Sequence, residues 1–523
     1  MENLKTIWHH QFYSLKTLEV NKCHKITIVF PSSLQKTYNN LEKLDITECA
    51  SVEEIFELSS NEKGSKQDAT HLKEITLSEM PKLKNIWSSD PQGILSFHNL
   101  KNISVTKCGS IRHLFPVSVA SCCSHLEILD LKFCENMKEI VAENKGSVGT
   151  TPIFEFNKLT LLLLWNLPKL KGFCAGNHTL SCPSLKASFV SGCSKLNLFK
   201  SSFTSIHKKF PNGKLPIAEE VPLFIVEKVI PELDELFIDY RDAKMILQDK
   251  NLNDVFTKIT HLGLLNGVTE EGIFPYWFLQ NVPILKWLIV DSSFFKKIFQ
   301  DERLVKEESN TRLQGLSLNH LPELQHICEE GCQIDPVLKQ LEYMEIGACH
   351  SLTMLSPSSV TFSHLTYLRI TNCDGLKKLI ASPTARSLAK LTTMIVKNCN
   401  SLEEIIAGSE DVEIALASLV ILTLECLPRL SKFCSSKSLL KLPLLEEVDV
   451  RECPRMKIFS EGNVSTPILR KVRTAEDVGK WHWKGNLNGT IKNMFEDKVC
   501  FDFPIDFLCN INSPVVFHWM HDG

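Results

Sequence analysis

Residues 126–141 read LEILDLKFCENMKEIV, and this stretch contains the pattern that decides the fold. Its frame is L-x-x-L-x-I-x-x-C-x-x-L-x-x-I, with exchanges among apolar residues, and it recurs along the chain. Further copies are LEKLDITECASVEEIF (41–56), LKNISVTKCGSIRHLF (100–115), LTYLRITNCDGLKKLI (365–380) and LTTMIVKNCNSLEEII (391–406). An apolar frame that recurs through 523 residues indicates an array of similar structural units.

The frame also has a regular period. It begins at Leu15, Leu41, Leu72, Leu100, Leu126, Leu159, Leu185, Leu313, Leu341, Leu365, Leu391, Leu419 and Leu445. Within each clear block, successive starts are 24 to 33 residues apart, most often 26 or 28. This spacing is typical of leucine-rich repeats, whose units are about 20 to 29 residues long.

The spacing within one unit predicts how the units pack. Positions four and six of the frame lie on one face of a short strand, because side chains alternate along a strand. One such strand buries little surface alone, so the units must stack and bury these residues between neighbours. We therefore expect an α/β leucine-rich-repeat solenoid of about 16 repeats. It would have a curved parallel β-sheet on its concave side and irregular, short helical or 3-10 segments on its convex side.

Position nine of the frame, where the chain turns off the strand, is usually cysteine. The cysteines at this position are Cys23, Cys49, Cys108, Cys134, Cys193, Cys349, Cys373, Cys399 and Cys453. Four other units have Met80, Leu167, Leu321 and Leu427 there, each followed by proline. Because apolar residues replace cysteine, we interpret the nine as a structural ladder of buried thiols. The sequence contains no C-x-x-C pair, so we expect no metal and no cofactor.

Composition and motifs restrict the function further. The formal charge is -3, without the basic excess that binding to nucleic acid requires. The most apolar run, 159–168, is about half as long as a membrane span, and no secretory leader opens the chain, so we expect a cytoplasmic protein. Phosphate-binding loops, H-E-x-x-H and G-x-S-x-G are absent, so we expect no enzyme. We predict four segments: an array over 1–200, a degenerate repeat or break at 201–230, a second array over 231–475, and a cap or tail over 476–523.

The outward positions of the frame, which are three, five, seven and eight, form the surface that can bind a protein. Two sets of them have the apolar, aromatic or mixed charged character of contact surfaces. The candidate residues are Ile128, Phe133, Leu161, Leu163, Trp165 and Phe189 in the first set, and Tyr343, Glu345, Tyr367, Arg369 and Asn372 in the second. The first set either binds a partner or is covered by another segment of the chain or by a second chain.

Charges in the return segment of the repeat alternate between neighbouring units. Glu53 and Glu54 precede Lys82 and Lys84 in the next unit, and GLKKLI, SLEEII and PRLSKF follow one another between 375 and 433. In a stack these side chains would face each other about 5 Å apart. The alternation therefore either sets the register of the stack or is an ordinary solvated face.

Several segments resemble the leucine-rich-repeat region of plant coiled-coil nucleotide-binding disease-resistance proteins. They are LFPVSVASCCSHLEILDLKFCENMKEIVAE (114–143), LPKLKGFC (167–174), SPTARSLAKLTTMIVKNCNSLEEIIAG (382–408), LPRLSKFC (427–434) and HWKGNLNGTIKNMFEDK (482–498). The resemblance implies a region that senses pathogen effectors or guarded host proteins and contacts the nucleotide-binding domain of the receptor. The coiled coil and phosphate loop of that family are missing here, so ATP binding is not carried over.

Two further expectations concern the identity of the chain. NLKTIWHHQFYSL (3–15) reads as the second half of a repeat, so we expect a C-terminal part, or a truncated form, of a larger receptor. The alternative is an F-box-type substrate adaptor for ubiquitin ligation, because NGVTEEGI (266–273) is similar to a turn of those repeats. The ectodomain of a surface receptor would instead need L-x-x-N-x-L-x-G-x-I-P units, which are absent.

Overall fold

The computed structural model consists of two compact units. Unit 1 comprises residues 1–265 with 281–285, and unit 2 comprises 266–280 with 286–523. The structure describes residues 14–34, 40–58, 68–92, 94–142, 152–175, 178–200, 223–225, 232–248, 257–274, 282–299, 313–328, 338–357, 360–408, 412–473 and 482–499. The opening stretch 1–13 therefore lies outside the described residues, as does nearly all of the expected break at 201–230.

The main sheet of unit 1 has one strand from each repeat, and every neighbouring pair is parallel. Its strands, in spatial order, are β1 (Thr17–Asn21), β3 (Lys43–Thr47), β6 (Glu74–Ser78), β9 (Asn102–Thr106), β11 (Ile128–Lys132), β14 (Leu161–Trp165), β17 (Ala187–Ser191), β20 (Glu235–Asp239) and β21 (His261–Leu265). Each frame position pairs with the same position of the next repeat, as Leu44 does with Leu18 and Ile75.

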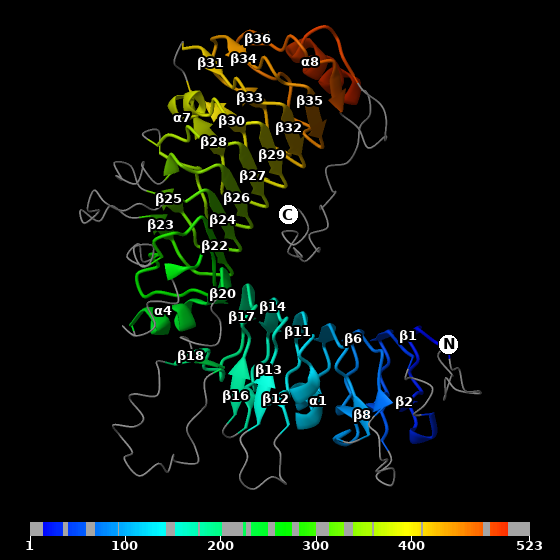
Figure 1. Cartoon of the computed structure of the whole chain (residues 1–523). Coiled ribbons are helices and arrows are strands. Elements are labelled where there is room, and N and C mark those ends of the chain that lie inside the picture. Colours follow the sequence, from blue (N-terminus) through cyan, green and yellow to red (C-terminus); the bar gives the residue numbers. More distant parts are fainter. Residues whose placement is uncertain are drawn as a thin grey trace. The chain divides into compact units, whose positions relative to one another are not determined.

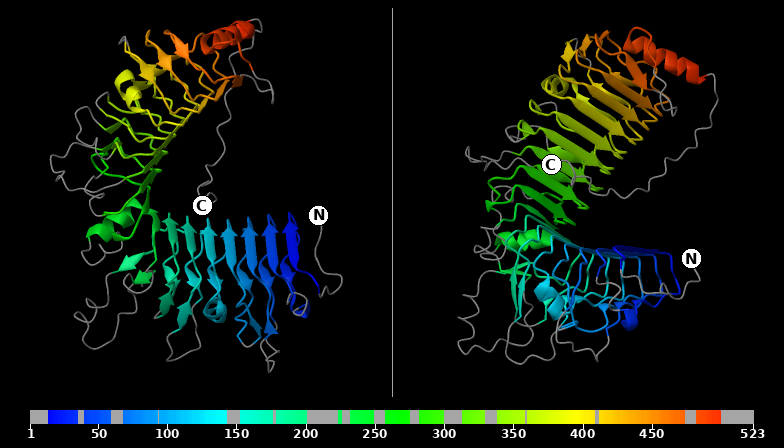
Figure 2. Two further views of the ribbon diagram at one scale, coloured as in Figure 1. Left: turned by 45° about the horizontal axis from the view of Figure 1, so that its top comes forward. Right: turned by 45° about the vertical axis from the view of Figure 1, so that its right-hand side comes forward.

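The main sheet of unit 2 is built in the same way. Its strands are β22 (Trp287–Asp291), β24 (Gly315–Asn319), β26 (Tyr343–Gly347), β27 (Tyr367–Thr371), β29 (Thr393–Lys397), β32 (Ile421–Glu425), β35 (Glu447–Arg451) and β37 (Lys471–Arg473). Figure 2 shows the strands of each unit as a row of parallel arrows. The number of turns is close to the number of repeats that the frame predicts, and the leucine-rich-repeat solenoid is confirmed.

The core of each unit lies between the main sheet and the return segments. In the repeat that begins at Leu41, positions one, four, six and nine are fully buried, and so are Val52 and Ile55 in the return segment. The outward positions of β3 are only half-buried. The period-two alternation of the sequence is therefore the alternation between core and surface.

The return side differs from the expectation of irregular or helical segments, because most of it consists of short parallel strands. These are β2 (Ile28–Phe30), β4 (Glu54–Phe56), β7 (Asn85–Trp87), β5 (Asp68–Ala69), β8 (Leu95–Ser96), β10 (His113–Phe115), β12 (Glu139–Val141), β15 (Gly172–Cys174), β13 (Ile153–Glu155), β16 (Thr179–Ser181), β18 (Phe199–Lys200), β19 (Phe224–Ile225), β23 (Lys297–Phe299), β25 (His326–Cys328), β28 (Lys378–Ala381), β30 (Glu404–Ala407), β33 (Lys432–Cys434), β31 (Ile414–Ala415), β34 (Leu440–Lys441) and β36 (Val464–Ser465). Their β-branched and aromatic residues stack in register, as the rings of Phe30 and Phe56 do at 5.1 Å.

Few helices are present in the described residues. They are η1 (Ser32–Leu34), α1 (Val117–Cys122), α4 (Tyr240–Gln248), α7 (Ser382–Ser387) and α8 (Leu487–Val499), and Figure 1 shows α1 in unit 1 and α8 at the end of unit 2. None of these described helices is both long enough and apolar enough to cross a bilayer. Of the tail expected over 476–523, residues 482–499 are described.

Candidate protein-binding site

A left-handed residue ends nearly every strand of the main sheets, and it positions the outward surface. Phe133 has φ 55°, and its backbone N–H donates to the carbonyl of Trp165 on the next strand at 2.9 Å. Position eight of the other frames has the same conformation: Lys22, Glu48, Glu79, Lys107, Asn166, Gly192, His320, Ala348, Asn372, Asn398, Cys426 and Glu452. Asn266 and Ser292, which follow β21 and β22 in the part of the array where the frame is weaker, share it. The backbone turn directs Phe133 outward, and this side chain is 42% exposed. Sequence reasoning missed this conformation, although Asn and Gly at several of these positions signal it.

The first candidate set gathers on three neighbouring strands of unit 1. Ile128 of β11 lies opposite Leu161 of β14, and Leu163 lies between Asp130 and Phe189. Trp165 lies opposite Lys132. Apart from Phe189 and the more exposed Phe133, the predicted members are half-buried. The set thus forms an apolar patch, here called the β11–β17 patch, on the outward face of the main sheet.

Phe189 corrects the prediction in one respect, because it is buried rather than exposed. Only 5% of it is accessible, since its ring stacks on that of Phe237 with the ring centres 4.0 Å apart. The Phe237 ring in turn lies over Gly263, where an added Cβ would meet the ring at 2.0 Å. Sequence reasoning missed Phe237, because its strand follows a long stretch in which the frame is weak.

Charged side chains border the β11–β17 patch on the β9 side. The carboxylate of Asp130 contacts the Lys132 ammonium at 3.0 Å and accepts a hydrogen bond from the Ser104 hydroxyl at 3.2 Å. Both members of this ion pair extend from β11, two residues apart. The patch therefore presents apolar side chains beside one compensated ion pair, which is a composition common in protein interfaces.

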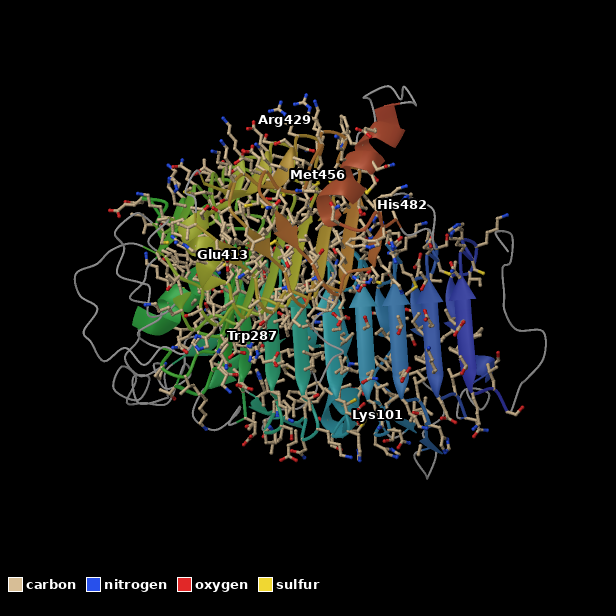
Figure 3. All side chains as sticks on the ribbon, turned by 90° about the horizontal axis from the view of Figure 1, so that it is seen from above. Lys101, Trp287, Glu413, Arg429, Met456 and His482 are labelled. Atoms are coloured by element: carbon tan, nitrogen blue, oxygen red, sulfur yellow. The ribbon has the colours of Figure 1, made fainter. Side chains whose placement is uncertain are left out.

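The second candidate set lies on β26 and β27 of unit 2. The rings of Tyr343 and Tyr367 stack with their centres 4.6 Å apart and an interplanar angle of 3°. Trp287 extends the row, with its centre 5.2 Å from that of Tyr343, and covers Gly315, where an added Cβ would meet the indole at 2.1 Å. Figure 3 labels Trp287, which sequence reasoning did not select because its frame is in the weak part of the array.

Polar contacts hold this aromatic row. The Tyr343 hydroxyl donates to Glu345 at 3.0 Å, and Glu345 contacts the Arg369 guanidinium at 3.5 Å. Burial and the neighbouring carboxylate raise the pKa of Tyr343, so the hydroxyl stays a donor. Asn372 is left-handed and half-buried, and its N–H donates to the carbonyl of Lys397 at 3.0 Å. This second surface thus combines aromatic and charged groups on neighbouring strands.

The nine cysteines at position nine point into the core and are at most 4% exposed. The thiol of Cys134 donates to the carbonyl of Lys132 at 3.4 Å and to that of Val105, one repeat earlier, at 3.7 Å. Burial raises the pKa of Cys134 to about 11 and that of Cys108 to about 12, so both thiols stay protonated at neutral pH. Across the described ranges, no three His, Cys, Asp or Glu side chains come together in a way that would hold a metal ion.

Two solved structures are similar to this chain over most of its length. The plant peptide hormone receptor RGFR1 in complex with RGF2 is 14% identical, with 86% of this chain and 79% of that chain covered and a TM-score of 0.21. The functional domain of InlJ from Listeria monocytogenes is 12% identical, with 82% and 75% covered and a TM-score of 0.25. At these TM-scores neither structure carries an argument about this chain.

Sequence comparison is more informative. "Putative disease resistance protein At4g19050" from Arabidopsis thaliana is 28% identical over 186 residues, which cover 33% of this chain but only 14% of that protein. The family described as plant disease resistance protein RPS2-like, leucine-rich repeats, matches residues 1–135, 232–362 and 356–461. These matches include more than half of the chain and both units. The chain therefore belongs to the leucine-rich-repeat family of RPS2-like plant disease resistance proteins.

Proposed function

We propose that this chain is the protein-recognition part of a cytoplasmic plant immune receptor. Its outward face binds a pathogen effector, or a host protein that the receptor guards, and it does so without catalysis. The nucleotide-binding domain of a complete receptor is the other protein partner that the resemblance implies. The family match supports a role in disease resistance and supports this reading over that of an F-box-type adaptor.

The β11–β17 patch is the observation that carries the proposal. Leu161, Leu163 and Trp165 occupy all three outward positions of β14. Polar side chains at these positions would not weaken the core, because the positions face away from it. By contrast, the same positions of β6 hold Glu74, Thr76 and Ser78 in the same sheet. Apolar side chains on a surface that the fold does not need to bury usually mark a contact.

Replacement of Trp165 by aspartate tests the proposal. A screen of the full chain against secreted pathogen proteins and host cytoplasmic proteins supplies purified ligands, and calorimetry measures their affinity for each variant. We expect Trp165→Asp to weaken binding at least tenfold, because a charge then replaces the largest apolar side chain of the patch.

The matched control is Ser78→Asp, which introduces the same charge at the same frame position on β6. The Ser78→Asp variant should bind the ligand as tightly as the unchanged chain does. Both variants should unfold at the same temperature as the unchanged chain. Equal affinity of the Trp165→Asp variant and the unchanged chain would remove the patch as the recognition site. Copurification with subunits of a ubiquitin ligase would favour the adaptor instead.

A further inference from the structure

Basic side chains form a row along one edge of unit 1. Arg112, Lys138 and Lys171 occupy position thirteen of three successive repeats, directly before β10, β12 and β15. The backbone N–H of Lys138 donates to the carbonyl of Arg112 at 2.9 Å, and that of Lys171 donates to the carbonyl of Lys138 at 2.8 Å. Because neighbouring strands lie about 4.8 Å apart, the three side chains extend from the fold side by side.

Two further bases lie in the same turns. Lys169 and Lys195 occupy position eleven of the repeats that begin at Leu159 and Leu185, and all five basic side chains are exposed. Lys169 donates to the amide oxygen of Asn136 at 2.6 Å. In the part of the chain that the structure describes, none of the five is in an ion pair. We call the set the basic ladder, and it consists of Arg112, Lys138, Lys169, Lys171 and Lys195.

Few carboxylates compensate the basic ladder. Positions ten to fourteen of its four repeats contain only Glu135 and Glu139. The Glu139 side chain is 16% exposed and contacts His113 at 3.4 Å. At the Lys195 end of the ladder, the Arg241 guanidinium of α4 donates to the Ser194 carbonyl at 3.4 Å, and it is paired with Asp242. The formal charge of the whole chain is -3, so this positive charge is a local concentration.

The order of charges in the ladder differs from that in other return segments. Like charges that face each other on neighbouring strands repel. Lys84 avoids such a contact, because it faces Glu53 at 2.6 Å, and in unit 2 the Lys377 position is followed by Glu403 in the next repeat. The core does not require the ladder bases, since they are exposed. A row of one sign that the fold does not need favours contact with an anionic partner.

The side chains around the ladder distinguish between classes of anionic partner. The large apolar residues at positions ten to fourteen of these repeats are buried, and small residues such as Gly109, Ser110 and Ser194 lie beside the bases. Protein interfaces are instead rich in aromatic side chains and poor in lysine, and single-stranded nucleic acid needs aromatic rings on which its bases stack. A lysine-rich cluster without such rings is typical of surfaces that bind anionic lipid headgroups.

The shape of this edge also suits a bilayer. Figure 2 shows the strands of unit 1 side by side, so the turns that follow them form one edge of the unit. Three strand spacings, or about 14 Å, separate the first and last turns of the ladder. Equal positions of successive repeats extend in the same direction, so all five bases can meet one flat surface together.

We propose that the basic ladder docks unit 1 on the anionic headgroups of a lipid bilayer. The ammonium and guanidinium groups contact the headgroups, and no side chain enters the hydrocarbon. The contact is therefore electrostatic and weakens as salt screens it. The ladder lies in the turns between main-sheet and return strands, whereas the β11–β17 patch lies mainly on the main-sheet strands. The proposal thus adds a membrane-binding surface to the proposed function and does not depend on it.

Cosedimentation of the full chain with lipid vesicles tests the docking. One set of vesicles consists of phosphatidylcholine alone, and the other contains about 30% phosphatidylserine, whose headgroup is anionic. At about 0.1 M salt, we expect at least fivefold more chain to sediment with the anionic vesicles. At about 0.5 M salt, this difference should disappear, because the charges are screened.

Neutralising the ladder tests which residues bind. The combined variant Arg112→Gln, Lys138→Gln and Lys171→Gln should lower partitioning onto the anionic vesicles at least tenfold. Its urea midpoint should stay unchanged or rise, because repulsion between the three bases is removed. The charge-preserving set Arg112→Lys, Lys138→Arg and Lys171→Arg should bind as the unchanged chain does, which separates the effect of charge from that of packing.

The matched control removes the same charge elsewhere. Lys158→Gln, Lys186→Gln and Lys390→Gln neutralise three exposed bases near the starts of their frames, away from the ladder turns. This combined variant should keep the partitioning of the unchanged chain. Equal sedimentation with both kinds of vesicle, or an equal loss in the ladder and control variants, would overturn the proposal. Tighter binding to polyglutamate or duplex DNA than to vesicles of equal anionic charge would assign the ladder to an acidic protein or to nucleic acid, and would also overturn it.

Discussion

At the scale of single residues, the left-handed position eight is the least expected feature. Side chains in this conformation, other than Gly and Asn, carry a cost of about 1–2 kcal/mol. A hydrogen bond offsets this cost, because the N–H of the residue at position eight donates to a carbonyl of the next strand. The N–H of Ala348, for example, donates to the carbonyl of Thr371 at 2.9 Å. The following cysteine then points inward. Because position eight requires this conformation, a residue that adopts it at a lower cost should stabilise the fold.

Ala348→Asn should stabilise unit 2 by about 1 kcal/mol, because asparagine tolerates φ near the 51° of Ala348. Asn372 and Asn398 already hold this position in the next two repeats. The midpoint of urea unfolding, followed by circular dichroism, measures the gain.

The control for this prediction is Ala187→Asn. Ala187 is half-buried in the extended strand β17, where asparagine has no conformational advantage. This variant should leave the urea midpoint unchanged or lower it. An equal rise for both variants, or a fall for Ala348→Asn, would contradict the role assigned to position eight.

At the scale of elements, ion pairs connect successive turns. Lys84 and Glu53 of neighbouring return segments form an ion pair at 2.6 Å, so these two oppositely charged side chains do face each other. A second row occurs at position two of the frame, where Glu42 contacts Lys73 at 2.6 Å and Lys16 at 3.0 Å. Sequence reasoning missed this row. One carboxylate thus joins three repeats, and it favours the observed order and register of the strands.

Glu42→Gln should lower the stability of unit 1 at neutral pH, and the effect should shrink in acid. Hydrogen bonds from Lys73 and Lys16, and their charges, lower the pKa of Glu42 from 4.5 to about 2. A carboxylate with a lowered pKa stabilises the fold fully above its unfolded pKa and loses this effect as the pH falls toward the folded pKa. The window here is pH 4.5 to about 2.

Urea unfolding at pH 7 and at pH 3, at low salt, measures the difference between the unchanged chain and the Glu42→Gln variant. The control is Glu446→Gln, at the same frame position in unit 2, where the side chain is exposed and the described contacts include no ion pair. It should have little effect at either pH. A Glu42→Gln difference as large at pH 3 as at pH 7 would show that the carboxylate charge does not stabilise the stack.

At the scale of the whole molecule, each repeat contacts its neighbours, so the last one has an open end that must be covered. Helix α8 covers the end of unit 2, and the Asn488 side chain attaches it to the preceding turn. Its Nδ2 donates to the carbonyls of Ser460 at 3.0 Å and Gly462 at 3.2 Å, and its Oδ1 accepts from the Ser460 N–H at 2.8 Å. Leu487 and Ile491 of this helix are buried. These contacts hold α8 against the last described turns of unit 2.

Asn488→Ala should loosen α8 and the last turns, since it leaves three backbone groups without their partner. Hydrogen exchange should become at least tenfold faster in α8 and β37, while β3 and β6 of unit 1 keep their rates, because a solenoid transmits stability only between neighbours. Lys492→Ala, an exposed change on the same helix, should leave exchange unaltered. Uniform acceleration throughout the chain would contradict this local action.

The sequence by itself determined the repeat, the strand of each unit and the inward side of that strand. The reason is local: the period-two alternation around Cys134 and the spacing between successive leucines are both visible in the letters. The position of most of the β11–β17 patch follows from the same frame, because equal frame positions become neighbours in a parallel stack.

Only the tertiary structure decided the features that depend on distant residues. Phe189 is buried because Phe237, 48 residues later and beyond a segment without a clear frame, stacks on its ring. The return segments become strands because each finds a partner one turn away, which a single repeat does not reveal. Position eight is left-handed because its N–H bonds to the next strand. In each case the energy comes from a contact between repeats, and that contact exists only once the repeats are stacked.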